Sequence, residues 1–216
     1  MTLHFRDRRE AGQLLAKELV QYRRDPKAVV YALPRGGVVT GCAVARALEL
    51  PLDIVVVRKI GHPGNPECAV GAMTETGEVI YNGIAIEGDA LKPTIAKERL
   101  EIERRKQAYR GPGSGISARG KIAIVVDDGI ATGLTLRAAL KTLRDQKPKG
   151  IIVAVPVAPR EEVERLAREI SRVVVLEDSE PFLGAVGAYY DDFSSVTDGE
   201  VVRCLELANK PRRVLQ

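Results

Sequence analysis

The sequence is poor in cysteine, histidine and aromatic residues. Its 216 residues include three cysteines, two histidines and no tryptophan, and its aromatic side chains are six tyrosines and three phenylalanines. The cysteines Cys42, Cys68 and Cys204 are odd in number and lack the spacing of a metal site. We therefore expect reduced thiols that fill the core of a cytoplasmic protein.

Patterns typical of membrane, repeat and dinucleotide-binding proteins are also absent from the sequence. No apolar run approaches the length of a membrane span, and there is no signal-peptide pattern, internal repeat or low-complexity tract. No G-x-G-x-x-G fingerprint is present. The 33 basic and 29 acidic side chains give a net charge of +4, which suits small anionic substrates but is too slight to predict binding to nucleic acid or a membrane.

What the sequence does contain is an alternation of short apolar strands and amphipathic helices. Hydrophobic residues make up 45% of the chain, which is enough for a sizeable core. The predicted strands are 28–33, 52–57, 122–126, 151–155 and 173–176, and the predicted helices include 37–48, 136–143 and 159–170. This order predicts an α/β fold with a doubly wound, mainly parallel sheet of about five strands. We expect a core over residues 1–176 and a smaller C-terminal segment over 177–216.

The remaining elements are predicted from turn and cap signals. Asp7 and Glu10 indicate a capping box for a first helix, and Thr197 and Glu200 indicate one for the last. An antiparallel hairpin is predicted over 69–81 and a charged surface helix over 94–109. The stretch 60–67 is dense in Gly and Pro, so we expect neither strand nor helix there but a lid.

The most informative segment joins the strand 122–126 to the next helix. Asp127 and Asp128 follow this strand directly, at the sheet edge where open α/β sheets bind ligands. Their carboxylates can accept hydrogen bonds from two vicinal hydroxyls, as on a ribose, and we expect both to face solvent. The small turn that follows can admit a phosphate to free backbone N–H groups at a helix start. The turn and helix start comprise Gly129, Ala131, Thr132, Gly133, Leu134 and Thr135. An acidic strand-to-helix turn with a Thr/Gly cap is also common in α/β proteins without such a ligand.

Two further strand ends carry basic residues. Arg35, Gly36 and Gly37 follow the strand 28–33 and form a second turn with free N–H groups, in which the Arg fork suits phosphate oxygens. Glycines in such a position can also serve only a tight turn. Arg58 and Lys59 follow the strand 52–57, where a basic pair can equally be a solvated surface feature.

The stretch Ala123 to Thr135 resembles the diphosphate-sugar signature of the type I phosphoribosyltransferases: four apolar residues, two acids, two apolar residues, then small-Thr-Gly-x-Thr. The resemblance implies that this chain binds phosphoribosyl diphosphate and Mg²⁺, transfers the 5-phosphoribosyl group to a ring nitrogen of a base, and releases pyrophosphate. It implies catalytic roles for Asp127, Asp128, Lys59 and Arg35, with the two aspartates also near the metal, and a pyrophosphate loop at Gly36 and Gly37.

In this family a small, variable hood holds the base. The C-terminal segment contains four of the aromatic residues, so the resemblance implies that it is the hood and that one of its rings stacks on a heterocycle. The rings are Phe182, Tyr189, Tyr190 and Phe193, of which we single out Tyr190 and Phe193. The same rings could instead pack the segment onto the sheet.

The sequence departs from the hypoxanthine-guanine branch of the family at one position. That branch carries an Asp before the Thr-Gly pair, which can accept a proton from the base, whereas this chain has Ala131. His62 and Glu67 are the remaining candidates for proton transfer. The overall pattern is most similar to predicted bacterial phosphoribosyltransferases of unassigned base, through the opening Phe-x-Asp-Arg-x-x-Ala-Gly, the stretch 33–82 and the ending 182–193.

Two other classes of function stay open. One is a regulatory protein that keeps the diphosphate-sugar site as a sensor, although fewer than 30 residues precede the first predicted strand, so we expect no winged-helix domain. An RNA-binding or partner-binding version remains open. The other is a different phosphosugar enzyme, such as a phosphorylase-like or hydrolytic one. For the enzyme we expect small-molecule substrates, no nucleic-acid or membrane partner, and a homo-oligomer, with a dimer favoured.

Overall fold

The computed structural model describes residues 3–84, 89–113, 115–178 and 180–210. Its centre is a five-stranded sheet with the order β2-β1-β6-β7-β8, in which every neighbouring pair is parallel. The strands are β1 (Ala28–Ala32), β2 (Leu52–Ile54), β6 (Ile122–Val126), β7 (Gly150–Val157) and β8 (Arg172–Glu177). The predicted α/β fold with a parallel sheet of about five strands is confirmed. The second strand is shorter than predicted, because it leaves the sheet after Ile54.

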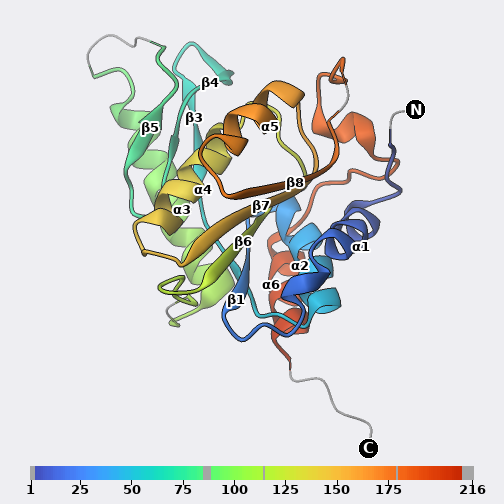
Figure 1. Cartoon of the computed structure of the whole chain (residues 1–216). Helices are drawn as coiled ribbons and strands as arrows, with labels where there is room; N and C mark the ends of the chain where they lie inside the picture. Colours follow the sequence, from blue (N-terminus) through green and yellow to red (C-terminus); the bar gives the residue numbers. More distant parts are fainter. Residues whose placement is uncertain (1–2, 85–88, 114, 179, 211–216) are drawn as a thin grey trace, which may run out of the picture.

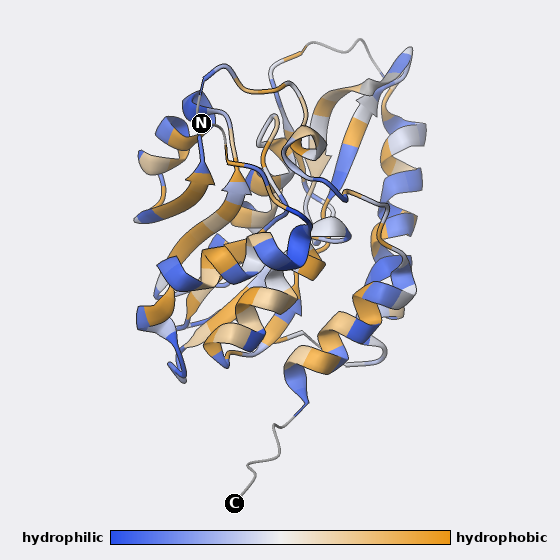
Figure 2. Ribbon diagram, turned by 90° about the vertical axis from the view of Figure 1, so that its right-hand side faces the viewer, coloured by the Kyte–Doolittle hydropathy of each residue, from blue (hydrophilic) through white to orange (hydrophobic). Residues whose placement is uncertain are grey.

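Helices cover both faces of this sheet (Figure 1). Helices α1 (Arg8–Glu18), α2 (Gly36–Leu48) and α6 (Asp198–Asn209) share one hydrophobic core, and α4 (Leu134–Arg144) and α5 (Arg160–Ala167) share the core on the other face. Figure 2 shows the central strands mostly in the hydrophobic colour, whereas the helices carry both hydrophilic and hydrophobic residues. Strands buried on both faces explain the near-continuous apolar runs of the sequence.

A second, antiparallel sheet stands beside the main one, next to α3 (Figure 1). It consists of β3 (Arg58–His62), β4 (Asn65–Met73) and β5 (Val79–Tyr81), and the predicted hairpin over 69–81 is confirmed as the β4–β5 pair. The prediction that 60–67 contains no strand is wrong, because this stretch contains the end of β3 and the start of β4. The pairing of β3 with β4 shifts register on either side of Gly61. Short edge strands and bulges tolerate the Gly and Pro residues that argued against a strand.

Of the two capping boxes predicted from the sequence, one is complete. Thr197 and Glu200 form the predicted capping box of α6. Asp7 caps α1 by accepting from the N–H groups of Arg9 and Glu10, but the Glu10 carboxylate accepts from the backbone N–H of Arg6 instead of closing a box with Asp7. The capping box predicted for α1 is therefore only half correct.

The other elements connect these layers. Helix α3 (Lys92–Arg110) is the charged helix predicted from the sequence, and it buries Ile102 and Tyr109 against the rest of the protein. Short 3₁₀ turns occur at η1 (Val20–Tyr22) and η2 (Val186–Tyr189). No described helix is both long and apolar enough to cross a membrane.

The expectation that all three cysteines fill the core is wrong for one of them. Cys42 is buried in α2, Cys204 is half-buried in α6, and Cys68 is exposed on β4. All three are free thiols. Strand β4 lies in the small sheet, which explains why its side chains reach solvent on one side.

A buried ion pair joins the end of α3 to both sheets. Arg110 Nε donates to Asp53 Oδ1 of β2 at 3.0 Å, and its other guanidinium nitrogens donate to Glu75 and to the Ile54 carbonyl. The side chains of Arg110 and Asp53 are 15% and 7% exposed. Because the carboxylates lie away from water, they depend on this guanidinium for compensation.

We expect Arg110→Ala to destabilise the protein by about 3 kcal/mol, because it leaves two carboxylates unpaired. The free energy of unfolding in urea measures this loss. Arg144→Ala is the matched control, because Arg144 pairs with Glu169 at the surface and such pairs contribute about 0 to 1 kcal/mol. Equal losses of unfolding free energy in the two variants would show that Arg110 stabilises the protein no more than a surface ion pair does.

Candidate functional site

Two of the predicted site segments meet because β1 and β6 are neighbours in the main sheet. Ala32 at the end of β1 is in register with Val126 at the end of β6, and the Leu33 N–H donates to the Val126 carbonyl at 3.1 Å. The turn with Arg35 and the acids Asp127 and Asp128 therefore leave the sheet at the same edge. The peptide bond between Pro34 and Arg35 is cis.

The first turn of α2 lies directly against the acidic pair. A Cβ atom on Gly36 would stand 1.9 Å from Asp128 Oδ2, and one on Gly37 would stand 2.5 Å from Asp127 Oδ1. Either distance is too short for any side chain. Glycine is required at both positions so that the β1–α2 turn can approach the two carboxylates.

The carboxylate of Asp128 is held in an ion pair that the sequence analysis did not foresee. Arg8 Nε donates to Asp128 Oδ2 at 2.7 Å, and the two side chains are only 10% and 16% exposed. Arg8 also donates to the Ser194 carbonyl at 2.9 Å, and its guanidinium lies 3.8 Å from the centre of the Phe193 ring. One guanidinium thus joins α1, the acidic pair and the C-terminal segment.

The carboxyl group of Asp127 is enclosed, although the residue as a whole is half-buried. Its Oδ1 accepts from the Asp128 N–H at 2.9 Å. Burial, and next the charge of Asp128, raise the pKa of Asp127 well above its usual range. The expectation that both carboxylates face open solvent is therefore wrong: one is enclosed and the other is covered by Arg8.

The predicted phosphate turn is open at the start of α4. Ala131 and Thr132 are exposed, and Gly133 takes a positive φ of 67° as the residue before the helix. No side chain caps the N-terminus of α4. The first N–H groups of an uncapped helix, with the helix dipole behind them, favour an anion.

The other residues of this turn are covered by their neighbours. Leu134 is buried and Thr135 is half-buried. Gly129 packs so closely on the C-terminal segment that a Cβ there would lie 2.4 Å from Val186 Cγ1. The turn therefore packs against the C-terminal segment at Gly129 and is exposed to solvent at Ala131 and Thr132.

An acidic side chain that the sequence analysis missed lies beside the same turn. Glu162 of α5 is buried, and its Oε2 would be 2.6 Å from a Cβ on Gly133. The carboxylate accepts from Arg165 at 2.6 Å and from Arg137 of α4 at 3.3 Å. Those two guanidinium groups balance the negative charge next to the open helix start.

The two predicted basic residues occupy different parts of the structure. Arg35 is exposed, and its Nη1 lies 3.8 Å from Oδ1 of Asp198 at the start of α6. Lys59 lies in β3, opposite Ala72 of β4. The structure therefore brings Arg35 to the edge where the acids lie, whereas it places Lys59 in the small sheet.

The two candidate proton-transfer residues belong to the β3–β4 hairpin. His62 ends β3, and its Nδ1 accepts from the Gly64 N–H at 3.0 Å. Glu67 is in β4, but its side chain lies outside the described residues. No described contact places His62 at the acidic pair.

The aromatic residues of the C-terminal segment form a connected group beside the acids. Tyr190 is buried, its hydroxyl donates to the Asp128 carbonyl at 2.6 Å, and burial raises its pKa. Its ring lies 5.0 Å from Phe193 and 5.3 Å from Phe5. Tyr190 therefore ties this segment to the acidic strand end, whereas Phe193 is half-buried and borders Arg8.

Nothing in the sequence around Arg8 marks it as a partner of Asp128. The sequence predicted a capping role for Asp7, whereas Arg8 was one of several polar residues in the first turn of the helix. Its partner is 120 positions away in the sequence. Helical periodicity cannot identify a contact of this range.

We expect Asp127→Asn to stabilise the unliganded protein at pH 7. Because the folded-state pKa is raised, the native state holds a proton that the unfolded chain loses above about pH 4, and stability falls as pH rises through that window. The amide keeps the acceptor for the Asp128 N–H and carries no charge. Thermal unfolding at pH 7 and pH 3 measures the effect, which should vanish at the lower pH. The exposed Asp191→Asn is the control, and a less stable Asp127→Asn at pH 7 would contradict the account.

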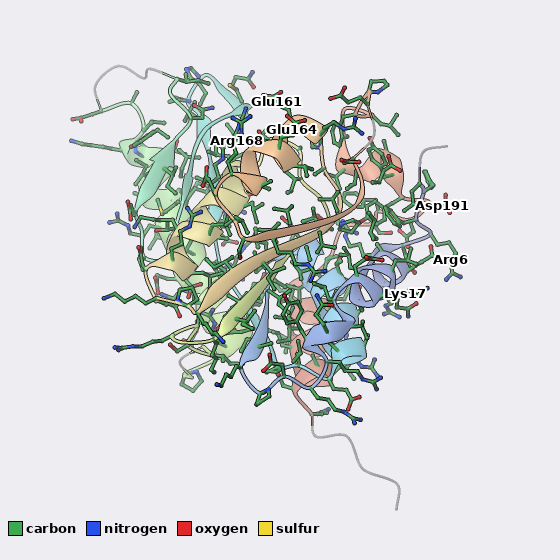
Figure 3. All side chains as sticks on the ribbon, in the orientation of Figure 1. Arg6, Lys17, Glu161, Glu164, Arg168 and Asp191 are labelled. Carbon is green, nitrogen blue, oxygen red and sulfur yellow. The ribbon has the colours of Figure 1, made fainter. Side chains whose placement is uncertain are left out.

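We expect Arg8→Ala to loosen the C-terminal segment, because it removes contacts to Asp128, Ser194 and Phe193. The loss of charge-assisted hydrogen bonds corresponds to about 2 kcal/mol, or about thirtyfold faster amide exchange in 186–194. Figure 3 shows the matched control, Arg6, on the outer side of the same end of the chain, where it pairs with Glu10. Unchanged exchange in Arg8→Ala would remove Arg8 as the anchor of the segment.

Comparisons with known proteins agree with this arrangement. The model of the phosphoribosyl transferase domain family matches residues 7–192. A Mycobacterium tuberculosis (strain H37Rv) protein named "Putative phosphoribosyl transferase" is 39% identical over 211 residues, which is 95% of this chain and 47% of that protein. The chain therefore spans about half the length of this relative. A Mycobacterium avium (strain 104) adenine phosphoribosyltransferase is 39% identical over 57 residues, 26% of this chain and 32% of that protein.

A solved structure extends the comparison to three dimensions. The protein TT1426 from Thermus thermophilus is 43% identical, with a TM-score of 0.78, and the match covers 94% of this chain and 98% of that one. The family match covers the Arg8, Arg35 and Asp127–Asp128 segments together. The chain belongs to the phosphoribosyl transferase domain family.

Proposed function

We propose that the protein transfers the 5-phosphoribosyl group of phosphoribosyl diphosphate to a ring nitrogen of a heterocycle, with release of pyrophosphate. The observation that carries this proposal is the meeting, at one edge of the sheet, of an uncapped helix start, a pair of acids and an Arg-Gly-Gly turn. Each part suits a different portion of a sugar diphosphate. The family supports the same class of reaction.

The phosphate and the ribose are assigned to neighbouring groups. The 5-phosphate binds the N–H groups at the start of α4, which no side chain caps, and the Thr132 hydroxyl. The vicinal hydroxyls of the ribose donate to the carboxylates of Asp127 and Asp128. During transfer the ribose ring gains positive charge, and the nearby acids favour that charge electrostatically.

The diphosphate is assigned to the β1–α2 turn. Arg35 and the N–H groups of Gly36 and Gly37 can hold its oxygens, and Lys59 would approach from the small sheet. The described residues contain no group of three or more side chains that could hold a metal ion. The two aspartates fit Mg²⁺ as partial oxygen ligands, with substrate and water completing the shell. Bound there, the ion would offset the charge of the leaving pyrophosphate.

Sugar binding has to compete with Arg8. In the structure its guanidinium occupies Asp128 Oδ2, one of the oxygens assigned to the ribose. A carboxylate can accept from more than one donor, so the sugar either shares the oxygen or displaces the guanidinium. Both outcomes couple sugar binding to the C-terminal segment, because Arg8 also bonds the Ser194 carbonyl.

The base is assigned to the side of the site that the C-terminal segment covers. Phe193 offers a half-buried ring for stacking, while Tyr190 holds the segment in place. Ala131 supplies no proton acceptor before the Thr-Gly pair. The proposal therefore names a nitrogen heterocycle without choosing among bases.

The test of the function is pyrophosphate release. The protein is incubated with phosphoribosyl diphosphate, Mg²⁺ and a panel of purines, pyrimidines and related heterocycles, and pyrophosphate is measured for each. We expect release with at least one base and none from the Asp127→Ala/Asp128→Ala variant. Tight binding of the sugar diphosphate without release for any base would favour the sensor, and normal turnover by the double variant would overturn the ribose assignment.

We expect Thr132→Val to weaken phosphoribosyl diphosphate binding by about 1 to 3 kcal/mol, the cost of a lost hydrogen bond to a charged group. Calorimetric titration measures the dissociation constant. Thr76→Val, in the exposed turn between β4 and β5, serves as the control. If the two variants bind equally, Thr132 does not contact the phosphate.

A further inference from the structure

A pocket separate from the phosphate turn lies behind Arg8. It has a volume of about 620 Å³ and lies between the start of α1, the segment 192–196 and α6. Its walls include the apolar side chains Val39, Val196 and Leu207 and the hydroxyl residues Ser194 and Ser195. A concave, partly apolar space of this size with a few polar groups is typical of a small-molecule site.

The acidic side chains of this pocket are already committed to local partners. Asp7 accepts from the N–H groups of Arg9 and Glu10, and Asp192 accepts from the N–H of Ser194. Glu200 accepts from the N–H and the hydroxyl of Thr197. Hydrogen bonds from the hydroxyl and the N–H of Ser194 lower the pKa of Asp192, and those from Thr197 lower the pKa of Glu200. These hydrogen bonds fix the three carboxylates at caps and turns, where their charges face the arginine side chains of the pocket.

The basic side chains of the pocket are less committed. Arg9 and Arg203 line it, and neither side chain makes a described ion pair or hydrogen bond, although their charges act with the bonds from Thr197 to lower the pKa of Glu200. Arg8 lines it as well, with part of its guanidinium on Asp128 and Ser194. Guanidinium groups that make no described hydrogen bond, beside the Ser195 hydroxyl, suit the oxygens of a phosphate group.

We propose that this pocket is a second ligand site, which binds a small phosphate-bearing anion through Arg9 and Arg203. The apolar wall of Val39, Val196 and Leu207 accommodates the uncharged part of such a molecule. This site is distinct from the helix start of α4, because none of the residues 129–135 lines the pocket.

The position of Arg8 links this site to the acidic pair. An anion in the pocket attracts the same guanidinium that pairs with Asp128, so occupancy weakens the Arg8–Asp128 pair and leaves that carboxylate freer to accept a ribose hydroxyl. This link rests on the proposed function, whereas the site itself does not.

Cys204 provides a local reporter of occupancy. It lines the pocket, and the Cys42 thiol donates to its carbonyl at 3.4 Å. The neighbouring Cys42 thiol and the charges of Arg9 and Arg203 lower the pKa of Cys204. A lowered pKa raises the fraction of thiolate, which is the form that iodoacetamide alkylates. Cys68 is exposed on β4, so it supplies an internal control.

The test measures the rate of iodoacetamide alkylation of Cys204 and Cys68 by mass spectrometry at pH 7.5, with pyrophosphate as the probe. We expect saturating pyrophosphate to slow Cys204 alkylation about tenfold, because a probe at about ten times its dissociation constant leaves about one site in eleven empty. Cys68 should not change. Sodium chloride of equal ionic strength should not protect Cys204.

Two variants separate this site from the proposed active site. Arg9→Ala/Arg203→Ala should abolish the protection, and Arg35→Ala/Thr132→Val should retain it, because those two residues belong to the other site. Absence of protection in the wild type, or protection that survives Arg9→Ala/Arg203→Ala, would overturn the proposal. Loss of protection in Arg35→Ala/Thr132→Val would do the same, since it would place the probe at the α4 turn. None of these readouts requires turnover, so a failure of the proposed enzyme activity leaves the test valid.

Discussion

The site depends on the pairing of β1 with β6. Their register brings the Arg-Gly-Gly turn and the two acids to one edge of the sheet, and the glycines let the backbone come within contact of both carboxylates. A side chain at Gly36 or Gly37 would collide with Asp128 or Asp127. The geometry of one strand pair thus fixes the distance between the group proposed to hold diphosphate and the group proposed to hold ribose. The uncapped start of α4, eight residues after β6, completes the same edge.

The carboxylates of Asp127 and Asp128 lie close enough to repel each other, and they are stabilised in different ways. Asp127 is enclosed with a raised pKa, and Asp128 is paired with Arg8. The solution costs stability at Asp127 and ties Asp128 to a residue that also anchors the C-terminal segment. In the unliganded protein neither carboxylate is therefore fully exposed to solvent. Because Arg8 contacts both Asp128 and the Ser194 carbonyl, sugar binding at Asp128 would also affect the position of the C-terminal segment.

The sequence was informative wherever a local pattern carried the structure. Apolar strand runs and helix caps predicted the parallel sheet, and the small-residue turn after Asp127 and Asp128 predicted the open helix start. The Gly- and Pro-rich stretch 60–67 misled because it lies in a bulged part of the β3–β4 pair, beyond the residues of β4 that pair with β5, and such positions tolerate residues that parallel core strands do not. Arg8 and Glu162 were missed because their contacts bridge distant elements, and nothing in their own neighbourhood marks them as partners of the site.

A crystal structure with bound ribose 5-phosphate tests the central claim most directly. The account predicts phosphate oxygens within hydrogen-bond distance of the N–H groups at 131–135, and the two ring hydroxyls on the carboxylates of Asp127 and Asp128. A sugar bound elsewhere, or a phosphate at the α4 turn with its hydroxyls directed away from both acids, would contradict it.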